Sequence, residues 1–313
     1  MVYAGAAGLV LPPTNGSNKD RIKEALKRLS AGGSTAGSRG IQLAYQMAEK
    51  AFIQGGINRV ILATDGDFNV GITSHSRLIK LIEQKRKSGI ALTVLGFGMY
   101  NLNDRTMEQL ANKGNGNYFY IDTLNEARKV LVTESASTLQ TIAKDVKIQV
   151  EFNPRYVKSY RLLGYENRKL RRRDFDDDTI DAGEIGAGHT VTAIYELTLT
   201  DRAVPGRSRN SRFNGEIAFF RLRYKKPGGS RSRLIEKPLL KSHILTDEPS
   251  DDFLFSSAVA YFAQRLRKSK YNRNVSYNRI LKVMKQSRGQ DKFSYRKECE
   301  SLVSMAIQYS RPK

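Results

Sequence analysis

The stretch Val60-Ile61-Leu62-Ala63-Thr64-Asp65-Gly66-Asp67 decides the fold of this chain, because it joins a short apolar run to a small acidic loop. A continuous apolar run is typical of a strand in a parallel sheet whose two faces are both covered by helices. The acidic loop then lies at the carboxyl end of the strand, the edge at which open α/β sheets bind their ligands. The stretch therefore predicts a parallel sheet with a ligand site beside Asp65.

Segments with helical spacing of apolar residues alternate with short apolar strands on both sides of this stretch. Such alternation is typical of an α/β fold, so residues 1–142 predict a doubly wound, mostly parallel sheet. Thr123, followed three residues later by Glu126, has the spacing of a capping box and predicts the start of the last helix. The expected helices are 18–29, 38–52, about 78–88, one near Met107, and 123–144, and the further strands are 90–97 and 118–121.

A different pattern begins at Asp145, where apolar residues alternate with polar ones at a period of two. This period indicates half-buried antiparallel strands, so residues 143–246 predict a β-sandwich. From residue 247 to residue 313 the spacing is again helical, which predicts a small helical region around Phe253, Ile280 and Leu302. The expected strands of the sandwich are 146–152, 157–163, 191–199, 216–224 and 232–240.

The 313 residues carry a formal net charge of +22, and most of this excess lies in the second half of the chain. Residues 1–142 contribute +6 and the remaining residues +16. Residues 202–237 hold 11 Lys+Arg against Glu216 and Glu236, and residues 265–313 hold 14 against three acidic residues. Such a potential attracts polyanions, so binding of nucleic acid or another anionic surface is an alternative function for this half.

Several classes of protein do not fit the sequence. No apolar run approaches the roughly 20 residues of a membrane-spanning helix, and no basic residue precedes the apolar opening of the chain, so we expect neither a transmembrane segment nor a signal peptide. Cys299 is the single cysteine, which excludes an internal disulfide and a multi-cysteine zinc site. The three histidines, which are His75, His189 and His243, are far apart and accompany no nucleophile, so we do not expect an enzyme.

Two loops at the expected ligand edge carry oxygen ligands. The first, Gly32-Gly33-Ser34-Thr35-Ala36-Gly37, combines small residues with the hydroxyl of Thr35, and the second contains the carboxylate of Asp65. A hydroxyl and a carboxylate, completed by water, suit the hard octahedral ion Mg²⁺. A phosphate-binding loop is a poorer interpretation, because Ser38 stands where such a loop requires lysine.

These loops resemble the second and third motifs of the metal-ion-dependent adhesion site of von Willebrand factor type A domains, in order, spacing and strand context. The resemblance implies that Thr35 binds Mg²⁺ directly and that Asp65 binds it directly or through water. It also implies that Ser34, Gly66 and Asp67 surround the ion without being its direct ligands. Three later segments resemble a bacterial subfamily in which a C-terminal domain of unknown function follows this module; they are residues 146–154, 162–168 and 181–189.

The sequence departs from the family at its first motif, because the pattern Asp-x-Ser-x-Ser occurs nowhere in the 313 residues. We therefore expect an N-terminally truncated module in which Mg²⁺ binding is weak or absent. Loss of a central strand would also expose an apolar edge, so we expect the chain to be marginally stable or to associate. The resemblance further implies that intact relatives are exported to the cell envelope.

Together the site and the resemblance predict a protein-binding, adhesion-type module. In the intact form of this module the metal would bind an acidic side chain of a partner protein, so recognition would depend on a divalent ion. In this chain the site is incomplete, and we expect the activity to be weak.

Overall fold

The computed structural model describes residues 1–3, 8–30, 37–66, 74–99, 102–165, 169–201, 215–242, 248–272 and 274–310. Its contacts divide the chain into two compact units. The first comprises Met1–Lys147, Asp178–His189 and Arg223–Arg233, and the second comprises Ile148–Asp177, Thr190–Leu222 and Leu234–Lys313. None of the helices among these described residues is both long and apolar enough to cross a membrane.

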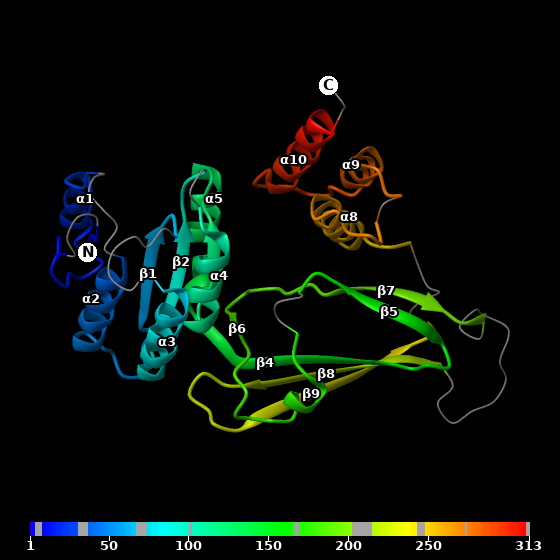
Figure 1. The fold of residues 1–313 in the computed structure, drawn as a ribbon, viewed down its shortest axis with the longest axis horizontal. Coiled ribbons are helices and arrows are strands. Elements are labelled where there is room, and N and C mark those ends of the chain that lie inside the picture. Colours follow the sequence, from blue (N-terminus) through cyan, green and yellow to red (C-terminus); the bar gives the residue numbers. More distant parts are fainter. Residues whose placement is uncertain are drawn as a thin grey trace. The chain divides into compact units, whose positions relative to one another are not determined.

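A parallel sheet of three strands forms the centre of the first unit (Figure 1). Its strands are β1 (Arg59–Thr64), β2 (Ala91–Gly96) and β3 (Tyr118–Tyr120), in the order β1-β2-β3. The register aligns Val60 with Leu92, and Val94 with Tyr118. The predicted parallel α/β sheet is thereby confirmed.

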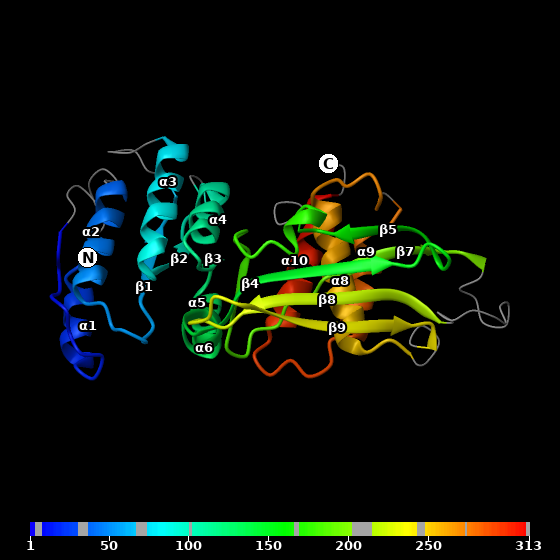
Figure 2. The same ribbon diagram turned by 90° about the horizontal axis from the view of Figure 1, so that it is seen from below.

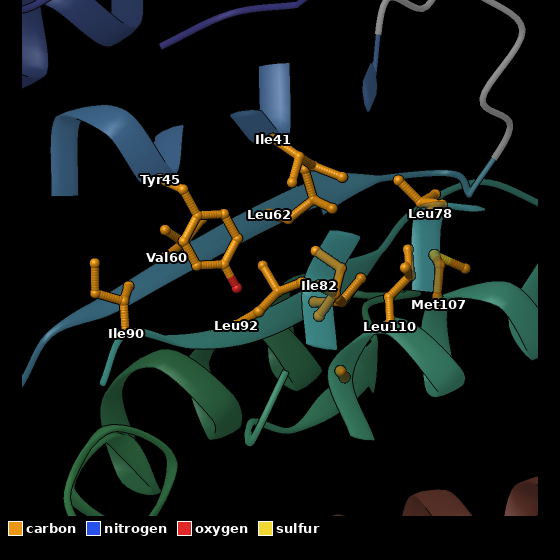
Figure 3. Packing of buried hydrophobic residues seen from close by; sticks show 12 residues of the cluster. Ile41, Tyr45, Val60, Leu62, Leu78, Ile82, Ile90, Leu92, Met107 and Leu110 are labelled. Carbon is orange, nitrogen blue, oxygen red and sulfur yellow. The ribbon is translucent and has the colours of Figure 1, made fainter. Parts of the chain in front are cut away.

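Helices before and between the strands cover one face of the sheet. They are α2 (Gly37–Lys50), α3 (His75–Lys85), which continues into the 3₁₀ turn η1 (Arg86–Ser88), and α4 (Asp104–Lys113). Ile41 and Tyr45 of α2 pack over β1, where they bury Val60 and Leu62 (Figure 3). The remaining helix before the sheet, α1 (Lys19–Lys27), has an amphipathic sequence but buries none of its residues.

The other face of the sheet is covered unevenly. Leu95 of β2 packs against Ile121 and Val130, so β2 is buried on both faces as its apolar sequence predicts. On β1, the side chain of Ile61 is 47% exposed and that of Ala63 is also exposed. The expectation that both faces of β1 are covered is therefore wrong for the described residues, because β1 lies at the edge of the sheet.

The segment after β3 differs from the single helix predicted over residues 123–144. It forms α5 (Leu124–Arg128), a π-helical turn η2 (Lys129–Thr133) and α6 (Ser135–Leu139). Thr123 caps the first of these by accepting a hydrogen bond from the Glu126 N–H, as expected. The helix ends early because β4 (Thr141–Phe152) begins at Thr141, where its backbone pairs with β6 (Gly183–Gly186).

The described strands after residue 140 form two sheets. The larger has the order β6-β4-β8-β9, in which β8 (Glu216–Lys225) lies beside β4 and β9 (Ser232–Leu240) lies beside β8 (Figure 2). The smaller pairs β5 (Val157–Leu163) antiparallel with β7 (Ile194–Leu199). Val157 of β5 and Ile217 of β8 belong to one buried cluster, so the two sheets pack as the sandwich prediction requires. The strand β6 was not predicted.

Three helices end the chain: α8 (Asp251–Leu266), α9 (Tyr277–Gln286) and α10 (Tyr295–Tyr309). Ser250 and Ser276 cap the first two by accepting hydrogen bonds from backbone N–H groups. Phe262, Met284 and Val303 come from the three helices and meet in one core cluster, against which the half-buried Cys299 also packs. The predicted helical region is thus present, whereas the domain boundaries at residues 142 and 246 stay predictions.

Replacement of Gly116 by alanine tests the close packing between the α4–β3 connection and β2. A Cβ atom at Gly116 would lie 2.0 Å from the carbonyl oxygen of Leu92, which is backbone and cannot rotate away. We expect the free energy of unfolding, measured by denaturant titration, to fall by about 1–3 kcal/mol. Gly16→Ala is the matched control, because nothing lies within 4 Å of a Cβ there. Equal stability of the two variants would contradict this packing.

Candidate metal and partner-binding site

The backbone at the end of β1 is held in one conformation. The hydroxyl of Thr64 accepts a hydrogen bond from the Gly66 N–H at 3.1 Å, and the Asn103 N–H donates to the carbonyl oxygen of Asp65 at 2.9 Å. Gly66 has a φ of +81°, and a Cβ there would lie 3.0 Å from the carbonyl oxygen of Asn103. Glycine is therefore required at this position, and the loop presents a half-buried Asp65 at the carboxyl edge of the sheet.

The N-termini of α3 and α4 are tied together near the same edge. Asn103 caps α4 by accepting a hydrogen bond from the Thr106 N–H at 3.1 Å. The imidazole of His75, the first residue of α3, lies 3.3 Å from the hydroxyl of Thr106 and also contacts the Gln109 amide. His75 is therefore held against α4 by its ring nitrogens, which gives it a structural role at this edge.

Tyr3 is a residue of this edge that sequence analysis missed. Its hydroxyl donates a hydrogen bond to the carbonyl oxygen of Ala63, and its ring packs against Gly40 of α2, where a Cβ would lie 2.5 Å from the Tyr3 Cβ. Burial raises the pKa of the Tyr3 hydroxyl, a hydrogen bond with Thr64 lowers it, and the charge of Asp65 raises it further. Tyr3 therefore lies beside the candidate site. The small residue Gly40 in the first turn of α2 is the one feature of the sequence that could have indicated this contact.

Two of the five predicted site residues, Asp65 and Gly66, belong to the described residues. Ser34, Thr35 and Asp67 lie outside them, so the structure does not test whether these residues approach Asp65. The helix α2 begins at Gly37, directly after the loop that contains Thr35. Within the described part of the chain, no group of three or more His, Cys, Asp or Glu side chains could hold a metal ion.

A second polar cluster of the first unit surrounds Glu184 of β6. Burial raises the pKa of Glu184 to about 7; the charges of Lys144 and Arg59 oppose this shift, and those of Asp181 and Asp145 add to it. The Oε2 atom of Glu184 is buried and has no hydrogen-bond partner among the described residues. Such a carboxyl group changes its protonation state near neutral pH, which sequence analysis could not foresee because burial depends on the fold.

Comparison with protein families identifies both parts of the chain. The model of the von Willebrand factor type A domain matches residues 1–133, and that of "Uncharacterized protein YfbK, C-terminal" matches residues 137–308. The chain is 44% identical over 315 residues to the uncharacterised protein YfbK of Escherichia coli (strain K12). That alignment covers 98% of this chain and 54% of the relative, so the chain spans about half the length of the curated relative.

Two solved structures are distantly similar. A von Willebrand factor type A protein from Catenulispora acidiphila has 15% identity and a TM-score of 0.42, with 87% of this chain and 65% of that chain covered. The human COPII-coat protein Sec24c has 12% identity and a TM-score of 0.43, with 86% and 38% covered.

The raised pKa of Glu184 predicts a pH-dependent stability. Because its pKa is higher in the folded chain than the ordinary 4.5, the protonated carboxyl stabilises the fold at low pH, and this stability is lost as pH rises through about 7. We expect the melting temperature of the native chain to fall as the pH is raised from 4.5 to about 7, and that of Glu184→Gln to fall less. Glu24→Gln, which changes an exposed carboxyl on α1, should keep the native profile. Identical profiles of the native chain and Glu184→Gln would contradict the assignment.

Proposed function

Because the chain belongs to the family defined by the YfbK C-terminal domain and carries a von Willebrand factor type A domain ahead of it, we propose that it binds a partner protein at the carboxyl edge of its parallel sheet. Von Willebrand factor type A domains mediate protein interactions. The observation that carries the proposal for this chain is the position of Asp65, directly after β1 in a loop that Thr64, Gly66 and Asn103 hold in place.

A divalent cation would take part in this binding. Asp65 would supply a carboxylate oxygen and Thr35 a hydroxyl oxygen, with Ser34, Gly66 and Asp67 around them. These are hard oxygen ligands of the kind that Mg²⁺ prefers. An acidic side chain of the partner protein then supplies a further oxygen to the ion, which makes recognition depend on both the cation and the partner's charge.

The donor set described at this edge supports only weak metal binding. Asp65 is the one carboxylate that the described residues place directly at the end of β1, and Mg²⁺ gives up its water ligands reluctantly. The hydroxyl of Tyr3 lies beside this carboxylate but is engaged with the carbonyl oxygen of Ala63. We therefore propose that this chain needs millimolar Mg²⁺ to bind its partner.

Calorimetric titration with MgCl₂ tests the metal part of the proposal. We expect no saturable heat below millimolar concentrations, because Asp65 is the one carboxylate that the described residues place directly at the end of β1. The small signal at higher concentration should disappear in Asp65→Asn and persist in Asp20→Asn, which removes an exposed carboxylate from α1. Tight binding in the micromolar range would show that other residues complete the site and would contradict the proposal of a weak one.

Crosslinking of the purified chain to proteins of its source organism tests the partner-binding part. A specific partner should be captured in millimolar Mg²⁺ and lost in EDTA, since the cation bridges the two proteins. Asp65→Ala should lose the same partner while Asp20→Ala retains it. Capture that is unchanged in Asp65→Ala would place the binding surface elsewhere on the chain.

A further inference from the structure

The exposed face of α9 carries three cations. Arg279, Lys282 and Lys285 are exposed and lie three residues apart, so they follow one another along adjacent turns of the helix. The opposite face buries Ile280 and Met284 in the core that α9 shares with α8 and α10. The apolar side of α9 is therefore buried against α8 and α10, and its solvent-exposed side is basic.

Acidic side chains do not neutralise this face. Residues 265–297 contain twelve Lys+Arg and a single acidic residue, Asp291. Asp291 accepts hydrogen bonds from the backbone N–H groups of Arg296 and Lys297. Glu300, which follows this segment, is paired with Arg288 at 2.7 and 2.9 Å. Within the described residues, no carboxylate lies at ion-pairing distance from the three cations of α9.

The neighbouring helix α10 exposes an apolar stripe. Leu302, Met305 and Tyr309 are spaced by three and four residues, which places them on one side of the helix, and Tyr309 is 86% exposed. Val303, on the other side, is fully buried in the core of the three helices. A further large apolar side chain, Phe293, is half-exposed in the connection between α9 and α10.

We propose that these three C-terminal helices dock on the surface of an anionic phospholipid bilayer. The cations of α9 attract the phosphate groups of the lipid heads, and the apolar side chains of α10 enter the headgroup region, where such residues anchor peripheral proteins. Nucleic acid would also attract the cations, but it would leave Leu302 and Met305 without an apolar environment. The combination of charge and aliphatic side chains therefore favours a lipid surface. This proposal is independent of the site at Asp65.

Sedimentation of the full chain with lipid vesicles tests the proposal. We expect binding to vesicles of phosphatidylcholine mixed with phosphatidylglycerol, little binding to phosphatidylcholine alone, and a decrease as NaCl is added. Neutralisation of α9 in the triple variant R279Q/K282Q/K285Q should weaken binding by roughly a hundredfold. The control R77Q/K80Q/K87Q removes three exposed charges from α3 and η1 and should bind like the native chain.

A second variant, L302Q/M305Q, separates insertion from charge attraction. It should keep the native melting temperature, because both side chains are half-exposed, and should weaken binding most at high salt, where apolar contacts dominate. Equal binding to neutral and anionic vesicles, or equal loss in the two triple variants, would overturn the proposal. Binding of a single-stranded oligonucleotide or of polyglutamate without binding of vesicles would also overturn it and would assign the basic face to nucleic acid or to an acidic protein.

Discussion

A strand inside a parallel sheet needs apolar cover on both faces, and most of the first unit depends on this requirement. The strand β2 meets it fully, with α2, α3 and α4 on one side and α5 and η2 on the other. The helices that supply this cover also connect the strands, and they return the chain so that β1, β2 and β3 run parallel. The carboxyl ends of these three strands therefore lie at one edge of the sheet. The position of Asp65 at that edge is a consequence of how the core is buried.

Local patterns in the sequence were enough to predict most of this architecture. The apolar runs that became β1, β2 and β3 are short and continuous, and the period of two after Asp145 signals antiparallel strands. The prediction failed where a distant partner decides the local structure. Residues 135–139 are helical, but Thr141 pairs with Gly186, a contact across 45 residues that no local pattern could reveal. The strand β6 escaped detection because only two of its four residues carry side chains.

The position of Asp65 could also be predicted from local sequence. Asp65 follows an apolar strand directly, and this placement is visible in the sequence. Tyr3 reaches the site across 60 residues, and Glu184 becomes a titratable group near neutral pH only because the fold buries it. Both depend on tertiary packing, which determines the local dielectric and the available partners. The position of a residue directly after a strand, such as Asp65, is thus easier to predict from sequence than the role of a residue that depends on burial.

The reactivity of the half-buried Cys299 thiol can report on the opening of the three C-terminal helices. A thiol packed partly against a core reacts faster with a disulfide reagent when the surrounding helices open, so a change in its exchange rate reports a change in that opening. Since the chain has one cysteine, the signal comes from one place without any engineering. The stability of the three helices is therefore accessible separately from that of the rest of the chain.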